Sequence, residues 1–552
     1  MFQKFPRLFL ILLAVLFVLN LIQSYFTELI YDEAYYWYYA QNLDWGYFDH
    51  PPMVAFLIKL SSFLFDGELG VRFMSCVLSV GTYLILWELI DNPKKKEYVS
   101  HFFLLLFSMT LMNAYGFLTL PDTPLLFFTA LFLLLYKWFL NKPSIWVSVF
   151  MGMVMAALMY SKYHAVLVIL FVFLSNLKLI KDKHAWLAVA VALVCYGPHF
   201  LWLYQNDFVS IKYHLYERPN QAYSFTKFTL GYFVNLVAIF GLLFYWVYLS
   251  LIKARSINKF TKALLYLTYG VIIFFFISSF NRRVQTQWII IISIPMAVLA
   301  FNHLIENAKS RKWMYGIGIV SMVILLYARV WLVHADLLPL LFETHGNKQW
   351  VSELNSKAGD VPIVFENSYR SAPMYEFYSG NPAFSLNNHM YRKNQYSIDD
   401  SEERVRNERI LYVSKYRTSG DITYSYPDGT LFYGVFMNDF QSYRKLQCIV
   451  EEPHEKSPYV LKVYNAYEFD IPLENLKYTV AYSNKYKQVK ELAPLQVNGL
   501  KNNETVLKSK DTVFFHFELP KTKMENPGYF RVGIAENDLL PGLNGKPIKL
   551  EE

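Results

Sequence analysis

The chain has 552 residues, of which 54% are hydrophobic and only 17% are charged. Ordinary soluble domains carry roughly 25% charged residues, so this composition excludes a wholly soluble protein and indicates one that spans a membrane. The formal net charge of +8 becomes informative only when the basic residues are located, and we expect no nucleic-acid partner. Of the three cysteines, Cys76 and Cys195 lie in apolar runs, so no disulfide framework is predicted.

Apolar segments long enough to cross a hydrocarbon core of about 30 Å recur about eleven times before residue 335. The first run is too long for a signal-peptide core and lacks a small-residue cleavage site, so we expect it to be retained. The pattern predicts a polytopic α-helical membrane protein. Its transmembrane helices are expected near residues 8–30, 69–90, 98–118, 122–140, 144–160, 163–180, 184–204, 226–252, 261–280, 285–305 and 312–333.

Lysine and arginine follow every even-numbered expected span. The residues are Lys94, Lys95 and Lys96, then Lys137 and Lys142, then Lys178, Lys181 and Lys183, then Lys253, Arg255, Lys259 and Lys262, and last Lys309, Arg311 and Lys312. Because positive charge concentrates in short cytoplasmic loops, the N-terminus is expected to be cytoplasmic. The first outer loop, residues 31–68, and everything after the eleventh span are then extracytoplasmic.

After residue 335 the long apolar runs give way to alternating strand-like segments such as "RILYVSK", "YVLKVYNAYEF" and "DTVFFHFEL". This change predicts a soluble extracytoplasmic region after a transmembrane domain over residues 1–334. Residues 335–450 are expected to form an α/β domain, because "VPIVFENSYRSAPMYEFYSG" places a strand before a helix. Residues 451–552 are expected to be β-rich, in the manner of a β-sandwich.

Basic residues at the outer ends of spans run against the orientation rule. They are Lys162, Arg218, Arg282 and Arg283. One explanation is an anion near the outer leaflet, and a pocket open at membrane level suggests the phosphate of a lipid. The alternative for any single one of them is a side chain that snorkels to the lipid headgroups.

The segment "YDEAYYWYYAQNLDWGYFDHPP", residues 31–52, resembles the first outer loop of GT-C glycosyltransferases in the clan of protein O-mannosyltransferases and lipid A aminoarabinose transferases. "LTLPDTPLLFFTALFLLL", "YSKYHAVLVIL" and "NDFVSIKYHLYER" resemble later segments of that clan. The resemblance extends to about residue 400. It implies a GT-C fold and an inverting transferase that moves a sugar from a polyprenyl-phosphate carrier, such as undecaprenyl phosphate, to an acceptor on the extracytoplasmic face.

The resemblance implies that Asp32 is the catalytic carboxylate. Inversion by direct displacement needs a base to take the proton of the acceptor hydroxyl. Glu33 is expected to orient either the acceptor or Asp32, because neighbouring helical residues point about 100° apart and only one of the two can be the base. The alternative for Asp32 is the N-cap of an interfacial helix.

Asp49 and His50 match positions where aminoarabinose transferases carry an acidic residue followed by Lys near the donor phosphate. His replaces Lys here, and an imidazole with an ordinary pKa near 6.5 serves as a cation, a hydrogen-bond donor or a metal ligand. We expect it to contact the leaving phosphate. The alternative is that His50 only closes the turn before Pro51 and Pro52. Because of this departure from the family pattern, the sequence does not identify the sugar that is transferred.

Lys162 is the first candidate for binding the donor phosphate, and Arg218 and Arg283 are weaker candidates. A cation fixed beside a departing phosphate stabilises the transition state more than the ground state. Asp122 in "LPDTP" is a candidate for an acceptor or metal role, or else a helix cap before Pro124.

Trp45 and Tyr47, which flank Gly46, are expected to stack on the sugar, although interfacial rings are commonly ordinary belt residues. The sequence leaves open whether a divalent cation is a cofactor, since this loop offers oxygen and nitrogen ligands. Those ligands are Asp32, Glu33, Asp44, Asp49 and His50.

The expected partners are a polyprenyl-phosphate sugar, the lipid bilayer, and an acceptor that is an envelope glycolipid or glycan such as lipid A, or else a secreted protein. The resemblance is closest to bacterial members, which favours a multi-pass protein of the cell inner membrane. A transporter is disfavoured because the two halves show no repeat. A non-catalytic glycan-binding scaffold would need only one or two spans.

Overall fold

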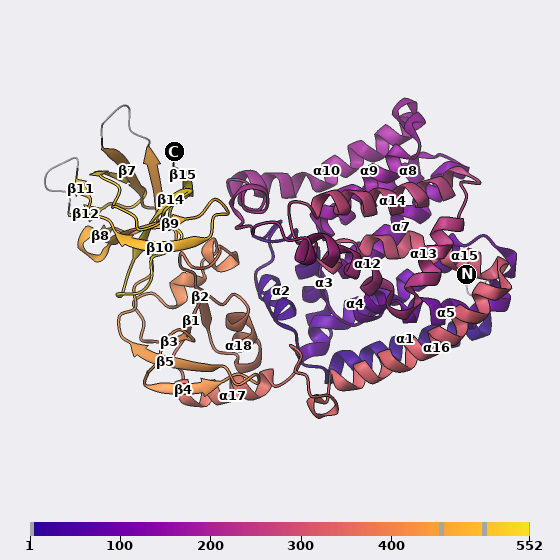
Figure 1. Cartoon of the computed structure of the whole chain (residues 1–552), viewed down its shortest axis with the longest axis horizontal. Coiled ribbons are helices and arrows are strands. Elements are labelled where there is room, and N and C mark those ends of the chain that lie inside the picture. Colours follow the sequence, from indigo (N-terminus) through magenta and orange to yellow (C-terminus); the bar gives the residue numbers. More distant parts are fainter. Residues whose placement is uncertain (1–4, 452–457, 500–504, 551–552) are drawn as a thin grey trace. The chain divides into compact units, whose positions relative to one another are not determined.

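The computed structural model describes residues 5–451, 458–499 and 505–550. The chain divides into two compact units. The helical unit comprises residues 1–207 and 223–345, and the C-terminal unit comprises residues 208–222 and 346–552. In Figure 1 the helical unit holds the elements from α1 to α16 apart from the short α11, and the C-terminal unit holds the strands.

Within its described residues the helical unit contains seven helical segments that are long and apolar enough to cross a membrane. They are α1 (Arg7–Phe26), α4 (Gly67–Leu89), α7 (Asp122–Asn141), α10 (Lys183–Gln205), the segment Thr226–Lys253 with α12 (Gly231–Phe240) and α13 (Phe244–Lys253), α14 (Lys259–Ser278) and α16 (Ala308–Trp331). Shorter apolar helices are α3 (Met53–Ser62), α8 (Ile145–Ser161), α9 (Val166–Leu174) and α15 (Ser293–Glu306). The prediction of a polytopic helical membrane protein is confirmed.

One expected span, residues 98–118, is broken into α5 (Val99–Ser108) and α6 (Thr110–Ala114). Met109 between them has extended backbone with φ −74° and ψ 104°. The break frees the carbonyl of Phe107, which accepts a hydrogen bond of 3.0 Å from the side-chain amide of Asn113. Non-helical backbone at membrane depth is tolerated when protein groups satisfy it in this way.

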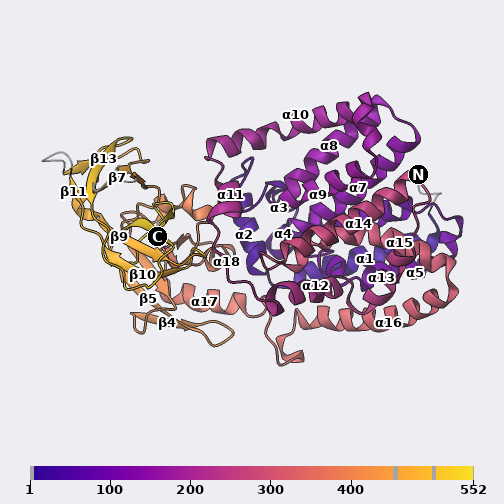
Figure 2. The same cartoon turned by 45° about the horizontal axis from the view of Figure 1, so that its top comes forward.

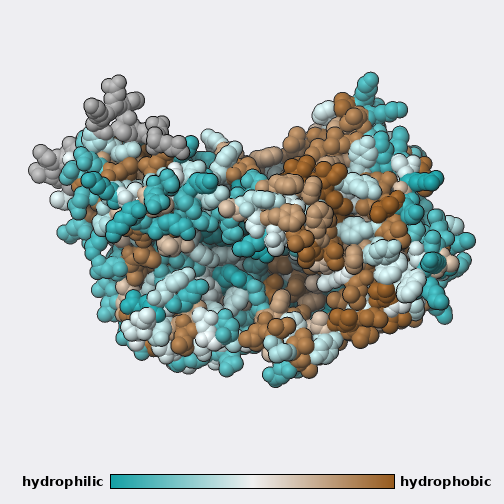
Figure 3. Space-filling model, in the orientation of Figure 1, coloured by the Kyte–Doolittle hydropathy of each residue, from teal (hydrophilic) through white to brown (hydrophobic). Residues whose placement is uncertain are grey.

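Apolar side chains cover the outside of the helical unit as well as its core. Val15, Val194, Ile252 and Val323 on four different helices are each more than half exposed. Figure 3 shows the resulting broad hydrophobic surface over the helices, whereas the surface over the strands of the C-terminal unit is mostly hydrophilic. Exposed apolar residues on long helices are the mark of a lipid-facing surface.

Helix packing positions the segment that follows the first span. The helix α8 packs against both α7 and α10, and Figure 2 shows α10 running along one edge of the unit beside α8. Gly152 of α8 permits this approach, because a Cβ there would lie 2.5 Å from the carbonyl oxygen of Ala188 in α10. The interfacial helix α2 (Tyr31–Gln41) follows α1 and packs on α3.

The C-terminal unit begins with an α/β layer. Its five-stranded sheet has the order β2-β1-β3-β5-β4, and β1 pairs in parallel with both β2 and β3. The strands are β1 (Ile363–Glu366), β2 (Ala383–Leu386), β3 (Ile410–Ser414), β4 (Ile422–Ser425) and β5 (Leu431–Met437). The helices α17 (Asn347–Ala358) and α18 (Ser371–Ser379) pack on this sheet, so the predicted strand-then-helix order is confirmed.

Two four-stranded sheets follow, with the orders β10-β9-β14-β15 and β11-β13-β7-β6. Val480 and Val532 from the first sheet share one core cluster with Val463 and Phe515 from the second, which makes a β-sandwich. The strands are β6 (Gln447–Glu451), β7 (Tyr459–Tyr464), β9 (Lys477–Ser483), β10 (Val489–Pro494), β11 (Asn498–Gly499), β13 (Thr512–Phe517), β14 (Tyr529–Ala535) and β15 (Ile548–Lys549). A separate small pair joins β8 (Ile471–Pro472) to β12 (Val506–Leu507).

Candidate functional site

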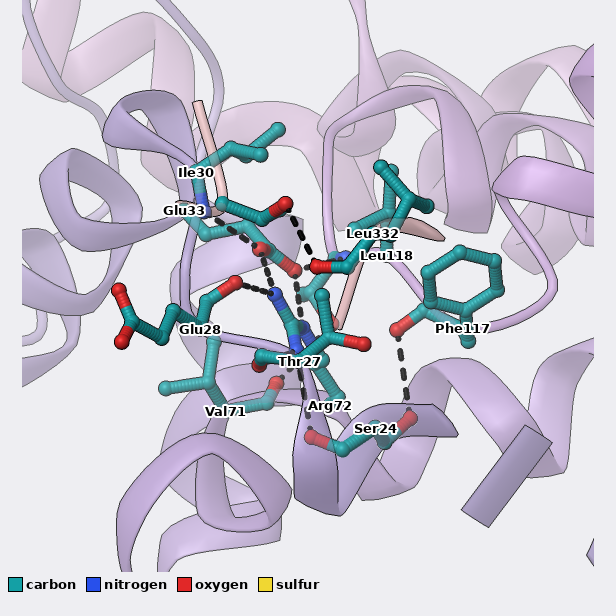
Figure 4. Close-up of polar contacts among 12 residues, drawn as sticks. Ser24, Thr27, Glu28, Ile30, Glu33, Val71, Arg72, Phe117, Leu118 and Leu332 are labelled. Carbon is teal, nitrogen blue, oxygen red and sulfur yellow. Dashed lines mark hydrogen bonds and ion pairs between the residues drawn. The ribbon is translucent and has the colours of Figure 1, made fainter. Parts of the chain in front are cut away.

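Glu33 is anchored in a buried ion pair with Arg72 of α4 (Figure 4). Its Oε1 accepts from Nε of Arg72 at 2.8 Å and its Oε2 from Nη2 at 2.5 Å. The backbone N–H of Thr119 also donates to Oε1 at 2.8 Å, and that of Ile30 donates to Oε2 at 3.2 Å. Both side chains are 0% exposed. The carboxylate of Glu33 therefore has its acceptor sites occupied by protein groups.

Arg72 ties the same carboxylate to the end of the first span. Its Nη1 donates to the carbonyl oxygens of Ser24 at 3.2 Å and Thr27 at 2.6 Å, and its Nη2 donates to that of Glu28 at 3.0 Å. These carbonyls lie at and beyond the C-terminal end of α1, where the last turn of a helix leaves acceptors unsatisfied. The cluster in Figure 4 thus fixes the junction between α1 and α2.

Asp32 is the second residue of α2 and is half-buried. The N-cap of this helix is Ile30, so the alternative interpretation of Asp32 as an N-cap is wrong. Because neighbouring helical residues point about 100° apart, Asp32 cannot share the environment of Glu33. The charges of Asp32 and Asp122 both act on the hydroxyl of Tyr115.

Of the two roles expected for Glu33, direct contact with an acceptor does not fit a side chain that is enclosed and fully hydrogen-bonded. Its contacts suit the other role, orienting Asp32 through the start of α2.

Asp122 and Lys162 form a second buried ion pair. Nζ of Lys162 donates to Oδ1 of Asp122 at 2.7 Å and to Oδ2 at 2.9 Å, and the two side chains are 6% and 4% exposed. Asp122 begins α7 but makes no capping bond, so the helix-cap alternative is wrong. Sequence reasoning proposed separate roles for the two residues and missed their pairing, because nothing local links positions 40 residues apart.

The loop after α2 is held by its own aromatic residues. The hydroxyl of Tyr35 donates to Oδ2 of buried Asp49 at 3.1 Å, and the ring of His50 packs edge-on against Tyr36 with 5.6 Å between centroids. The carbonyl of His50 also accepts a hydrogen bond of 3.1 Å from the backbone N–H of Tyr47. Asp49 and His50 therefore lie against the rings of α2, on the same short segment as Asp32.

The two rings predicted to stack on a sugar differ in their surroundings. Trp45 is 56% exposed and lines a hollow of about 370 Å³ together with residues of α10. Tyr47 is 2% exposed and stacks face to face on Tyr39 with 4.2 Å between centroids. Burial raises the pKa of Tyr47 well above its ordinary value. The expectation that Tyr47 stacks on sugar is wrong, because its ring is buried and stacks on Tyr39 instead.

Two residues of α10 that sequence reasoning did not single out hold this loop. Nε1 of Trp202 donates to Oδ2 of Asp44 at 2.7 Å, and Nδ1 of His199 lies 2.7 Å from the carbonyl oxygen of Trp45. A Cβ on Gly46 would lie 2.4 Å from the ring of Trp202. The only sequence signal for these contacts is the glycine between Trp45 and Tyr47, since close packing on a ring requires it.

The remaining predicted cations fall in different places. Arg283 follows α14 in the helical unit and is exposed, whereas Arg218 belongs to the C-terminal unit. The described residues bring together no group of three or more His, Cys, Asp or Glu side chains able to hold a metal ion. The five metal ligands that the sequence offered include Glu33, which Arg72 occupies instead.

Comparison with known proteins finds a matching family and solved structures of similar fold. The family described as dolichyl-phosphate-mannose-protein mannosyltransferase matches residues 49–202. The structure of ArnT from Cupriavidus metallidurans in the apo state matches with a TM-score of 0.53 and 14% identity, over 74% of this chain and 92% of that one. The chain therefore shares the fold of that ArnT structure. The structure of the same ArnT bound to undecaprenyl phosphate matches this chain with a TM-score of 0.52, the same identity and the same coverage.

A curated relative is the lipid A galacturonosyltransferase RgtD of Rhizobium johnstonii. It is 24% identical to this chain over 290 residues, which are 50% of this chain. The chain spans about 60% of the length of that relative. The family match begins at Asp49 and includes His50, Asp122 and Lys162, while Asp32 precedes it.

Proposed function

We propose that this protein is an inverting glycosyltransferase that moves a sugar from a polyprenyl-phosphate donor to an acceptor on the extracytoplasmic face of the membrane. The observation that carries the proposal is the separation of the Asp-Glu pair after the first span. Arg72 and two backbone N–H groups occupy Glu33, so of the two carboxylates we assign the base to Asp32. A base at that position suits the attack of an acceptor hydroxyl.

In the proposed reaction Asp32 takes the proton of the acceptor hydroxyl. The hydroxyl oxygen bonds to the anomeric carbon as the bond from that carbon to the phosphate oxygen breaks, with inversion of configuration. The polyprenyl phosphate leaves with increased negative charge, so a cation placed there stabilises the transition state. An ammonium group has three N–H donors, and Lys162 uses two of them on Asp122. The third is free to donate to a phosphate oxygen.

His50 and Asp49 remain proposed phosphate-side residues, with Arg283 and Arg218 as additional cations and Trp45 as the ring that stacks on sugar. A polyprenyl-phosphate donor is supported by the likeness in fold to ArnT, whose structure contains undecaprenyl phosphate. A metal-free reaction and a metal-assisted one both agree with these residues.

We propose an envelope glycolipid or glycan such as lipid A as the acceptor, and the bacterial inner membrane as the location. Similarity to the lipid A galacturonosyltransferase over half of the chain supports that acceptor class. The match of residues 49–202 to the mannosyltransferase family favours the second candidate, transfer to Ser or Thr of secreted proteins. The proposed orientation has a cytoplasmic N-terminus and an extracytoplasmic C-terminal unit.

The test is loss of a lipid-linked sugar donor, followed by mass spectrometry, with the purified protein in lipid nanodiscs and extracted polyprenyl-phosphate sugars. We expect Asp32→Asn to lower the rate by about 10²- to 10⁴-fold, the contribution of a positioned base. Asp336→Asn is the matched control, because Asp336 is exposed in the same unit outside residues 31–52. Equal rates for both variants and the unchanged protein would overturn the assignment of Asp32. The mass lost from the donor identifies the sugar.

A further inference from the structure

A cavity of about 200 Å³ lies entirely within the C-terminal unit and carries an excess of positive charge. Five stretches of chain form its walls: residues 208–222, the loop after β2, the turn between β9 and β10 with the adjoining strand ends, β14, and Pro547 just before β15. The charged residues that line it are Glu217, Arg392, Lys393, Lys487 and Arg531. Four cations thus face a single carboxylate in a small concave space. Such a charge balance attracts an anion.

Arg531 is the central cation of this cavity. In the described part of the chain its guanidinium makes neither a hydrogen bond nor an ion pair within 4.0 Å. Burial lowers the pKa of Arg531 to about 10, while Glu217 and Tyr213 act in the opposite direction, so the group remains charged at neutral pH. Glu217 acts on it only from more than 4.0 Å away, so an anion in the cavity would give the guanidinium a direct partner. A guanidinium also matches carboxylate and phosphate oxygens in shape.

His389 is a second unsatisfied group in the cavity wall. It is 2% exposed, and within the described residues neither ring nitrogen has a hydrogen-bond partner. Burial holds the pKa of His389 well below its ordinary value, and the charges of Arg531 and Arg444 act in the same direction. The neutral ring offers one donor and one acceptor. Buried polar atoms are nearly always paired in native proteins, so this ring is an exception among the buried groups of the cavity wall.

The remaining lining residues suit a sugar ring. Tyr213 and Tyr391 place aromatic rings in the wall, and Ser483 and Gln488 add polar groups. Aromatic faces pack against the C–H groups of a saccharide, while polar side chains reach its hydroxyls. The volume is below the roughly 300 Å³ at which drug-sized sites begin, so the space suits one small ligand.

The segment 208–222 is fastened to the sandwich at this place. The backbone N–H of Asn220 donates to the carbonyl of Tyr486 at 3.0 Å, and the side-chain amide of Gln488 donates to the carbonyl of Asn220 at 3.0 Å. Nζ of Lys487 donates to the carbonyl of Tyr216. These bonds hold Tyr213 and Glu217 in the cavity wall, although the segment lies in sequence between two membrane-spanning helices.

We propose that this cavity binds a small saccharide bearing an oxyanion, either a carboxylate or a phosphate, with Arg531 as the anchoring cation. Tyr213 and Tyr391 pack on the sugar. The site belongs to the C-terminal unit and is separate in the chain from Asp32 and its neighbours, so it goes beyond the proposed transfer reaction.

The test is calorimetric titration of the full-length protein in phosphatidylcholine nanodiscs with glucuronate, glucose 1-phosphate, inorganic phosphate and glucose. We expect saturable binding of glucuronate or glucose 1-phosphate, and no heat from neutral glucose. Arg531→Gln is expected to weaken that binding by roughly tenfold or more, the usual cost of losing a charge-assisted hydrogen bond. Whichever of the two anions binds more tightly identifies the oxyanion.

Lys490→Gln is the matched control, because Lys490 is exposed on β10 and does not line the cavity. Should Arg531→Gln fail to fold, Lys393→Gln at the cavity wall is expected to weaken binding while Lys490→Gln does not. Absence of saturable binding, or equal binding by Arg531→Gln and the control, would overturn the proposal. Equal affinity for inorganic phosphate and glucose 1-phosphate would overturn its saccharide part. Binding is measured without turnover, so a failed transfer reaction leaves this result interpretable.

Discussion

At the scale of single residues, the ion pair with Arg72 gives Glu33 a structural role, which distinguishes it from Asp32, the proposed base. Both side chains are fully buried and bonded to each other through two hydrogen bonds. Removing one partner of such a pair leaves an uncompensated charge in the protein interior, which typically costs about 3–5 kcal/mol. We expect Glu33→Gln to lower the thermal unfolding midpoint in detergent clearly. Asp32→Asn is expected to leave the midpoint nearly unchanged while lowering the rate of donor consumption by about 10²- to 10⁴-fold.

The control for this prediction is Glu97→Gln, an identical substitution at an exposed position. Surface changes of this kind usually stay within about 0.5 kcal/mol. A Glu33→Gln variant as stable as Glu97→Gln would show that the ion pair contributes little, and an Asp32→Asn variant as unstable as Glu33→Gln would assign Asp32 to the structure and not to the chemistry.

The sequence indicated the importance of the Asp-Glu pair but not the division of labour within it. The divergence of Asp32 and Glu33 was expected only on the condition that residues 31–40 are helical, and α2 meets that condition. The choice of which one is enclosed depends on Arg72 and on the backbone N–H of Thr119, which lie 39 and 86 residues away from Glu33. Contacts over such separations have no local pattern, and the pairing of Asp122 with Lys162 escaped prediction for the same reason.

At the scale of elements, the loop after α2 depends on its packing against α10. Gly46 faces the ring of Trp202, whose Nε1 is bonded to Asp44 in the same loop. Because an added Cβ would lie 2.4 Å from that ring, Gly46→Ala must displace either the loop or the helix side chain. Overpacking of this kind costs about 1–3 kcal/mol. We expect a lower unfolding midpoint and a reduced rate of donor consumption, since Asp49 and His50 move with the loop.

Gly197→Ala is the matched control on α10, where a Cβ would meet nothing within 4 Å. Alanine is favoured over glycine in a helix by roughly 1 kcal/mol, so this variant should be as stable as the unchanged protein or more so. If Gly46→Ala behaved like Gly197→Ala in both measurements, the contact between the loop and α10 would not be required for activity.

Element prediction succeeded where a segment's own sequence determines its structure. All eleven apolar segments contain helices. The predicted strand-like runs form strands that begin at Ile410, Tyr459 and Thr512. The break at Met109 was not predicted, because its stability comes from the amide of Asn113 and not from a proline or glycine. The short helix α3 inside the first outer loop was also missed, since it lies between expected spans.

At the scale of the whole molecule, one segment belongs to a different compact unit from the residues that precede and follow it in the sequence. Residues 208–222 lie between two membrane-spanning helices yet belong to the C-terminal unit. The sequence predicts an outer loop here, with Arg218 as a candidate for binding phosphate. Its hydrogen bonds to Tyr486 and Gln488 could not be foreseen, because they join positions more than 260 residues apart.

The proposed orientation of the chain in the membrane can be tested by labelling cysteines introduced at three positions. Basic residues follow α4, α7, α9, α13 and α15, so these ends are expected to face the cytoplasm, while residues 31–52 and the C-terminal unit face the opposite side. We expect a membrane-impermeant maleimide to label Lys490→Cys and Asn42→Cys in intact spheroplasts, and Lys96→Cys only after the membrane is opened. All three positions are exposed, so accessibility within the fold is matched.

The unchanged chain is the control, because Cys76 and Cys448 are buried and Cys195 is only partly exposed, which predicts low background labelling. Labelling of Lys96→Cys and Lys490→Cys from the same side would contradict the orientation and with it the extracytoplasmic acceptor. The positive-inside argument rests on short loops, where a few lysines determine which side a span faces. Agreement at Asn42 and Lys490 would place the proposed base and the anion-binding cavity in one compartment, where the lipid-linked donor and a saccharide ligand of the cavity could both be presented.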